Sequence, residues 1–248
     1  STPSNDFYGG GRKGDNLFAE SLVALDARTG ERRWHYEIVH HGVWDYDLPT
    51  APILAPRAGS DVVVQLTKQG YAFVFDRETG APVWPIEERP APPGNVPGER
   101  LAPTQPIPSR PAPFAKQGFT EEDLIDFTPE LRAVAARAVA GYRMGALYTP
   151  PSLEGTLLMP GLIGGAGWGG GAVDPSSGSL YVKATNSPAM IRLYRPPQSD
   201  TVQGEYSFDR TATLRFGDLD AREARAARRD HVAEHLNFIR GKAGHVAA

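Results

Sequence analysis

Residues Leu25–Trp34 read LDARTGERRW, and the same skeleton returns in FDRETGAPVW at Phe75–Trp84. The two copies lie 50 residues apart, and in both of them a Trp follows the leading Asp by eight positions. A weaker third copy is VDPSSGSLY at Val173–Tyr181. Each copy predicts a β-turn between strands, in which the Asp accepts backbone hydrogen bonds, the Gly takes a positive φ and the Trp packs outward.

The spacing of these turns indicates the architecture. A turn that recurs about every 50 residues is typical of a β-propeller, whose blades usually have four strands. The alternative is that common hairpin turns recur here by chance. Gly and Pro together make up 50 of 248 residues, about a fifth, against an ordinary combined share of roughly 12%, which favours many short strands. The predicted strands are Ser21–Leu25, Asp61–Leu66, Tyr71–Phe75 and Leu180–Ala184.

Composition excludes several functional classes. A net charge of −3 gives no electrostatic footprint for nucleic acid. The absence of Cys excludes disulfides, thiolate metal sites and cysteine nucleophiles. No apolar stretch approaches the ~20 residues that a transmembrane helix needs. Because the chain begins with Ser1 and no signal-peptide pattern precedes it, we expect it to be processed or cut from a longer protein.

A Pro-rich region separates the second and third turns. Ten of the 29 residues from Pro85 to Pro113 are proline, which predicts an extended segment that contributes no ladder donors. Thr120 with Asp123 resembles a capping box, and Thr128 before Pro129 predicts a helix that ends near Ala140. We interpret residues 85–156 as a partly helical insertion into the β scaffold.

The last segment differs in character from the rest. Asp218–Arg240 is rich in Ala, Arg and Glu without turn residues, which predicts a polar helix and makes 217–248 a helical tail. A shifted reading frame after Phe216 would explain this change, and we state that as a hypothesis. His231 and His235 lie four residues apart, as a metal pair would, although two surface histidines by chance explain them better.

The densest group of chemically active residues is HHGVWDYDLP, from His40 to Pro49. A carboxylate there is suited to act as a general base or to bind a hard cation. The alternative is a hydrogen-bonded loop that ties two blades together. Lys68 is a second candidate, because a Lys at a buried strand end would hold an anionic oxygen or pair with a carboxylate. The alternative for Lys68 is an ordinary solvated side chain.

The run GGAGWGGG at Gly164–Gly171 is a third candidate. It lacks the strand–GxGxxG–helix context of a dinucleotide site. Its glycines permit a close backbone approach around one large aromatic side chain, Trp168.

Taken together, these motifs resemble the quinoprotein alcohol and glucose dehydrogenases, which are eight-bladed propellers that use pyrroloquinoline quinone (PQQ). The resemblance covers roughly residues 2–193, and the Pro-rich region is similar to the glucose-dehydrogenase-like branch. The segments that carry it are Ser21–Asp26 with the turn to Trp34, His40–His41, Trp44–Pro49, Lys68–Gly70, Phe75–Arg77, Pro103–Pro106, Tyr148–Ser152 and Trp168–Gly170.

The resemblance implies a chemistry and a set of roles. Asp45 would be the general base and a ligand of the metal, Ca²⁺ or Mg²⁺. Lys68 and Trp168 would contact PQQ, with Lys68 stabilising negative charge on the quinone oxygens. The substrate would be a glucose-like aldose or another alcohol, and electrons would pass to a quinone or cytochrome acceptor. A periplasmic location follows, with membrane association through a segment outside this chain.

The chain departs from the family pattern at three positions. Gly42 stands where an Asp usually follows the His pair, Thr2 stands near a metal-ligating Asn, and Lys183 replaces an Asn common near the cofactor. Three turn copies do not close an eight-bladed ring, so we expect residues 1–216 to be an all-β propeller fragment. The alternative function is a non-catalytic propeller scaffold or an inactive fragment.

Overall fold

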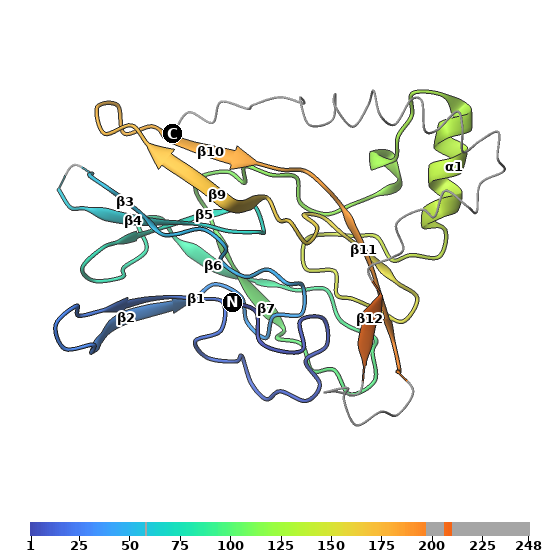
Figure 1. Ribbon diagram of the computed structural model, residues 1–248, viewed down its shortest axis with the longest axis horizontal. Coiled ribbons are helices and arrows are strands. Elements are labelled where there is room, and N and C mark those ends of the chain that lie inside the picture. The colour runs from blue at the N-terminus through green and yellow to red at the C-terminus, as the bar shows by residue number, and fades with distance from the viewer. Residues whose placement is uncertain (58, 197–205, 210–248) are drawn as a thin grey trace.

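The computed structural model describes residues 1–57, 59–196 and 206–209, and within these ranges the chain is mostly strands (Figure 1). The strands are β1 Ser21–Leu25, β2 Arg32–Glu37, β3 Ile53–Ala55, β4 Val62–Leu66, β5 Ala72–Asp76, β6 Ile86–Pro90, β7 Thr104–Pro108, β8 Thr156–Leu158, β9 Ala166–Val173, β10 Leu180–Ala184, β11 Ala189–Tyr194 and β12 Ser207–Asp209. The helices are a 3₁₀ turn, η1 Glu121–Asp123, and α1 Pro129–Val139. The predicted tail helix 218–240 and the His231/His235 pair lie outside the described ranges.

The strands form small antiparallel sheets of two or three strands, which differ from the four-stranded blades expected. The sheets within the described ranges are β1–β2, β3–β4–β5, β6–β7, β9–β10 and β12–β11–β8. Figure 1 shows β1–β2, then β3–β4–β5, then β9–β10 stacked from bottom to top, as neighbouring blades are. The number of blades and the extent of the Pro-rich insertion stay predictions.

The predicted turns are confirmed. Asp26 Oδ1 accepts hydrogen bonds from the backbone N–H groups of Arg28 and Thr29, at 2.9 and 3.1 Å. Gly30 takes φ +74°, and the corresponding Gly80 and Gly178 take +73° and +71°. Such φ values are costly for residues with a Cβ, which explains why Gly recurs in all three copies. The first turn joins β1 to β2, and the third joins β9 to β10.

Trp34 corrects one expectation, because it does not point outward. Its indole N–H donates to the carbonyl oxygen of Arg77 at 3.1 Å, and its ring centroid lies 6.0 Å from that of Phe75. A Cβ at Gly80 would lie 2.5 Å from the ring. The Trp of the first turn therefore packs onto the second turn and joins the first sheet to the second, a contact that one turn considered alone does not reveal.

This contact predicts that two Gly→Ala substitutions lower the free energy of unfolding by different amounts. Gly30→Ala adds only the strain of a positive φ, about 1–2 kcal/mol, because no atom lies within 4 Å of the place its Cβ would take. Gly80→Ala adds the same strain and also displaces Trp34, so we expect a further loss of about 1–3 kcal/mol. Urea unfolding of the two variants measures the difference. Equal losses would contradict the docking of Trp34 on the second turn.

The Pro-rich region is more regular than expected. β6 and β7 both lie in it and pair in register, with Glu88 opposite Pro106 and Arg89 opposite Gln105. The expectation that this region contributes no ladder donors was therefore wrong in part, since its non-proline residues pair and a proline is tolerated where its nitrogen faces away from the partner strand.

Both predicted helix starts are confirmed. Thr120 and Asp123 form the capping box of η1, and Thr128 caps α1 by accepting a hydrogen bond from the backbone of Leu131. α1 ends at Val139, one residue before the predicted end.

The core lies between the sheets and supports the loop that follows β2. Its largest fully buried side chains include Trp44, Tyr46, Phe73 and Phe75. A smaller cluster beneath α1 joins Val139 to Leu157 of β8. No helix in the described ranges is long and apolar enough to span a membrane.

Candidate functional site

The loop between β2 and β3 presents two carboxylates on one side. Trp44 and Tyr46 are fully buried, and each donates a hydrogen bond to a carbonyl oxygen, Trp44 to Thr149 at 3.2 Å and Tyr46 to Pro160 at 2.7 Å. The alternating Asp45 and Asp47 are only half-buried. Anchoring of the two aromatic side chains in the core therefore directs both aspartates away from it, toward a common partner.

Lys68 is that partner. It lies in the tight turn between β4 and β5, where the N–H of Gly70 bonds the carbonyl of Thr67 at 3.1 Å. Its Nζ lies 2.5 Å from Asp47 Oδ1 and 3.2 Å from Asp45 Oδ2. The prediction that Lys68 pairs with a carboxylate is confirmed, and it pairs with two. Asp47 was not singled out from the sequence, although its i+2 spacing from Asp45 would have predicted that both side chains lie on one side of the loop.

The surroundings make the Asp45 carboxyl more basic than usual. Burial raises its pKa, and this effect outweighs the attraction of Lys68, which lowers it. The charges of Asp47 and Asp6 raise the pKa further. A partly desolvated carboxylate beside an ammonium group is suited to accept a proton while the ammonium binds an anionic oxygen.

The glycine-rich run lies directly against Lys68. The N–H of Gly165 donates to the carbonyl of Lys68 at 2.7 Å, and a Cβ at Gly164 would lie 2.3 Å from Lys68 Cγ. The glycines therefore do permit a close backbone approach, but at Lys68 and not around Trp168 as predicted. Trp168 follows on β9 with 92% of its surface exposed, so its indole ring is a flat apolar surface open to a ligand. Lys183 of β10 lies beside Gly169, where a Cβ would be 3.2 Å from Lys183 Cδ.

The two histidines hold the loop in place. His40 bonds Glu37 through Nδ1 at 2.8 Å and Glu88 through Nε2 at 3.1 Å. His41 is buried and bonds the carbonyl of Gly14 and the carboxylate of Glu99, at 2.7 and 3.2 Å. Through His40 the loop joins β2 to β6, which agrees with the alternative of a hydrogen-bonded loop, whereas His41 joins it to residues outside the strands.

Carboxylates and a histidine also gather beside this loop in a way that could hold a metal ion. In the described part of the chain, one group of three residues brings ligand atoms within 4.8 Å of one another, namely Asp15, Glu37 and His40. Asp45 is not among them. The carboxylates of Asp45 and Asp47 are nevertheless the oxygen ligands that Ca²⁺ and Mg²⁺ prefer.

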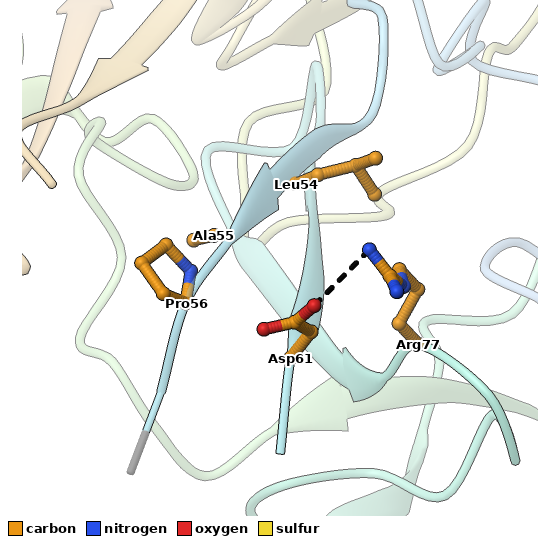
Figure 2. A pocket seen from close by; sticks show the side chains of 5 residues that line it. All are labelled: Leu54, Ala55, Pro56, Asp61 and Arg77. Carbon is orange, nitrogen blue, oxygen red and sulfur yellow. Dashed lines mark ion pairs between the residues drawn. The ribbon is translucent and has the colours of Figure 1, made fainter.

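A shallow pocket lies at the start of β4, at the end of the strand away from Lys68. It is lined by Leu54, Ala55, Pro56, Asp61 and Arg77 (Figure 2). Asp61 and Arg77 form an ion pair at 3.2 Å. Because Asp61 precedes β4 and Lys68 follows it, this pocket is separate from the site around Asp45.

Comparisons with known proteins find one family and several relatives. The family model for PQQ, described as "Glucose/ethanol/alcohol dehydrogenase, beta-propeller domain", matches residues 1–238. The quinate/shikimate dehydrogenase (quinone) of Acinetobacter baylyi is 34% identical over 203 residues, which are 79% of this chain and 25% of that protein. The quinoprotein glucose dehydrogenase of Gluconobacter oxydans is 36% identical over 194 residues, 76% of this chain and 24% of that protein.

A solved structure was also matched. Quinohemoprotein alcohol dehydrogenase from Comamonas testosteroni is 25% identical, with a TM-score of 0.44, over 75% of this chain and 23% of that one. The chain therefore spans about a quarter of the length of the relatives it matches.

Proposed function

Because the chain belongs to the family of PQQ-dependent glucose, ethanol and alcohol dehydrogenases with a β-propeller domain, we propose that it forms part of the active site of such an enzyme. The proposed reaction oxidises a glucose-like sugar or another alcohol. The observation that carries the proposal is the contact of Lys68 Nζ with Asp45 Oδ2 at 3.2 Å, beside the glycine-rich run. Relatives named for glucose, glycerol and quinate support this substrate class.

The residues of the site fit the proposed cofactor. PQQ is an anion with carboxylate and quinone oxygens, and Lys68 offers a buried positive charge to such oxygens. The glycines at 164 and 165 leave room for a close approach of backbone. The adjacent Gln69 has a buried Oε1 without a hydrogen-bond partner, and Trp168 offers an exposed ring face for stacking.

In the proposed reaction the hydride and the proton of the alcohol go to different acceptors. When bound, PQQ supplies the quinone that takes up the hydride from the alcohol carbon. Asp45 accepts the hydroxyl proton, so the alcohol loses one hydride and one proton and becomes a carbonyl product. Lys68 would hold the quinone oxygens of the bound cofactor and would stabilise negative charge there. Asp47, which contacts Lys68 at 2.5 Å, orients the ammonium group.

A Ca²⁺ or Mg²⁺ ion belongs to the proposal, with Asp45 as one ligand. Such an ion acts as a Lewis acid on an oxygen. Asp45 and Asp47 supply two carboxylates, fewer than the six or more oxygen ligands that Ca²⁺ takes. The other ligands would come from water, the cofactor or further oxygen-bearing groups of the protein. The proposal also includes a quinone or cytochrome electron acceptor and a periplasmic location.

Titration of the gene product that contains residues 1–248 with PQQ tests the proposal. We expect Lys68→Ala to raise the dissociation constant about 10- to 100-fold, because it removes a charge-assisted hydrogen bond worth about 1.5–3 kcal/mol. Lys13→Ala removes an exposed lysine and is the matched control. Equal affinity of wild type and Lys68→Ala would instead favour a scaffold in which Lys68 only pairs with aspartates.

A further inference from the structure

Glu20 is a buried carboxylate with no role in the proposed reaction. It lies immediately before β1, is fully buried, and takes φ +47°. Its Oε1 accepts a hydrogen bond from the hydroxyl of Thr2 at 3.0 Å, whereas its Oε2 has no partner. Burial raises the pKa of Glu20 to about 7. A carboxylate kept at such a position needs an explanation beyond packing.

Gly42 explains the direction in which Glu20 points. A Cβ built on Gly42 would lie 1.8 Å from Glu20 Oε2 and 2.6 Å from its Cδ. The carboxylate of Glu20 thus fills the space in which a side chain at position 42 would begin. Glu20 is fully buried and Thr2 holds its other oxygen, so a side chain at position 42 would have to displace a carboxylate that is packed and hydrogen-bonded.

Arg12 connects this contact to the loop that carries Asp45. Its guanidinium donates to the carbonyl of Gly42 at 2.8 Å, and its charge is attracted to Glu20 and Glu99. Gly42 therefore lies against the carboxylate of Glu20, and its carbonyl oxygen is bound by the guanidinium of Arg12. It lies three residues before Asp45 and follows directly on the buried His41.

We propose that Glu20 is a positioning residue of the Asp45 loop, and that its carboxylate, reaching in from the start of β1, occupies the place of a side chain at position 42. Gly42 is the counterpart of this arrangement, because a Cβ at position 42 would displace the carboxylate of Glu20 from its place. The steric part of the inference stands alone, while its consequence for Asp45 and Lys68 rests on the proposed function.

An exchange experiment on the gene product tests the pair. We expect Gly42→Asp alone to lower the urea midpoint and to weaken PQQ binding at least about tenfold, because two carboxylates then compete for one buried space. The double variant Glu20→Ala with Gly42→Asp restores one carboxylate to that space. Its PQQ affinity should return to within about threefold of wild type, since neighbouring substitutions are not additive. A stable Gly42→Asp variant, or simple addition of the two single losses, would overturn the inference.

Two milder variants keep the test decisive if Gly42→Asp does not fold. Gly42→Ala adds one methyl group against Glu20, and Gly11→Ala is its control, since no atom lies within 4 Å of the place a Cβ would take at Gly11. Only Gly42→Ala should lower the urea midpoint. This readout needs no PQQ, so a failure of PQQ binding in every variant would overturn the proposed function and leave the steric pair tested.

A conservative replacement of Glu20 distinguishes a role in positioning the Asp45 loop from a role in stability alone. Glu20→Gln keeps the shape of the side chain, and we expect its PQQ affinity to stay within about threefold of wild type. Glu20→Ala, measured at a temperature where it is folded, should bind PQQ at least about tenfold more weakly because the Asp45 loop loses its support. Folded Glu20→Ala with unchanged affinity would reduce Glu20 to a structural residue and refute its positioning role.

Discussion

Asp45→Asn is expected to lower the rate of alcohol oxidation by about 100- to 10,000-fold, because positioned general bases contribute factors of that size. The amide keeps the size of the side chain but does not accept the hydroxyl proton. Lys68 keeps its 2.5 Å contact with Asp47, so PQQ binding should change far less than the rate. Dye-linked oxidation of glucose and simple alcohols by the gene product, supplied with PQQ and Ca²⁺ or Mg²⁺, measures the rate.

A second aspartate provides the matched control. Asp61 pairs with Arg77 at the other end of β4 (Figure 2), so Asp61→Asn removes a carboxylate that lies away from Lys68. We expect Asp61→Asn to retain the wild-type rate. Equal rates for Asp45→Asn and wild type would refute the role of Asp45 as the base, and equal losses in both variants would trace the effect to general destabilisation.

Trp44→Ala is expected to cost about 3–5 kcal/mol of folding free energy, the range typical of a large aromatic removed from a core. Trp44 is fully buried, its ring lies 5.1 Å from that of Tyr148, and its indole N–H bonds the carbonyl of Thr149. For a chain of this length the loss lowers Tm by roughly 10 °C. Thermal unfolding followed by circular dichroism measures it.

Trp168→Ala is the natural comparison, because both residues are tryptophans but Trp168 is 92% exposed. We expect it to change stability by no more than about 0.5 kcal/mol. If Trp168 stacks on the cofactor, the same variant weakens PQQ binding. A large loss of stability in Trp168→Ala, or a negligible one in Trp44→Ala, would contradict the arrangement of the loop.

Local features were predictable from the sequence because their determinants are neighbours in the chain. The Asp26 turn needs only an Asp whose carboxylate accepts the next backbone N–H groups and a Gly four positions later. The start of α1 at Thr128 and Pro129 is local in the same way. Strands Ser21–Leu25 and Leu180–Ala184 were predicted at their observed bounds for this reason.

The candidate site was predictable only in part. Their residue types identified Asp45 and Lys68 as separate candidates. Only the resemblance to a family indicated that the two belong to one site, because periodicity and spacing do not bring them together. The sequence contains no local signal that Asp47 would lie closer to Lys68 than Asp45 does. The pairing of the Pro-rich strands β6 and β7 was missed for a related reason, since ladder register depends on which N–H groups face the partner.

By itself, the sequence determined the turns, the helix caps, the strand-rich character and the residue types from which a quinoprotein site is built. Only the tertiary structure decided that Trp34 packs on the second turn, that Lys68 bridges two aspartates, and that Glu20 fills the space that a side chain at position 42 would take. The physical reason is distance along the chain. A hydrogen bond between neighbouring residues follows from local backbone geometry, whereas contacts between residues 20 or more positions apart depend on how the sheets pack.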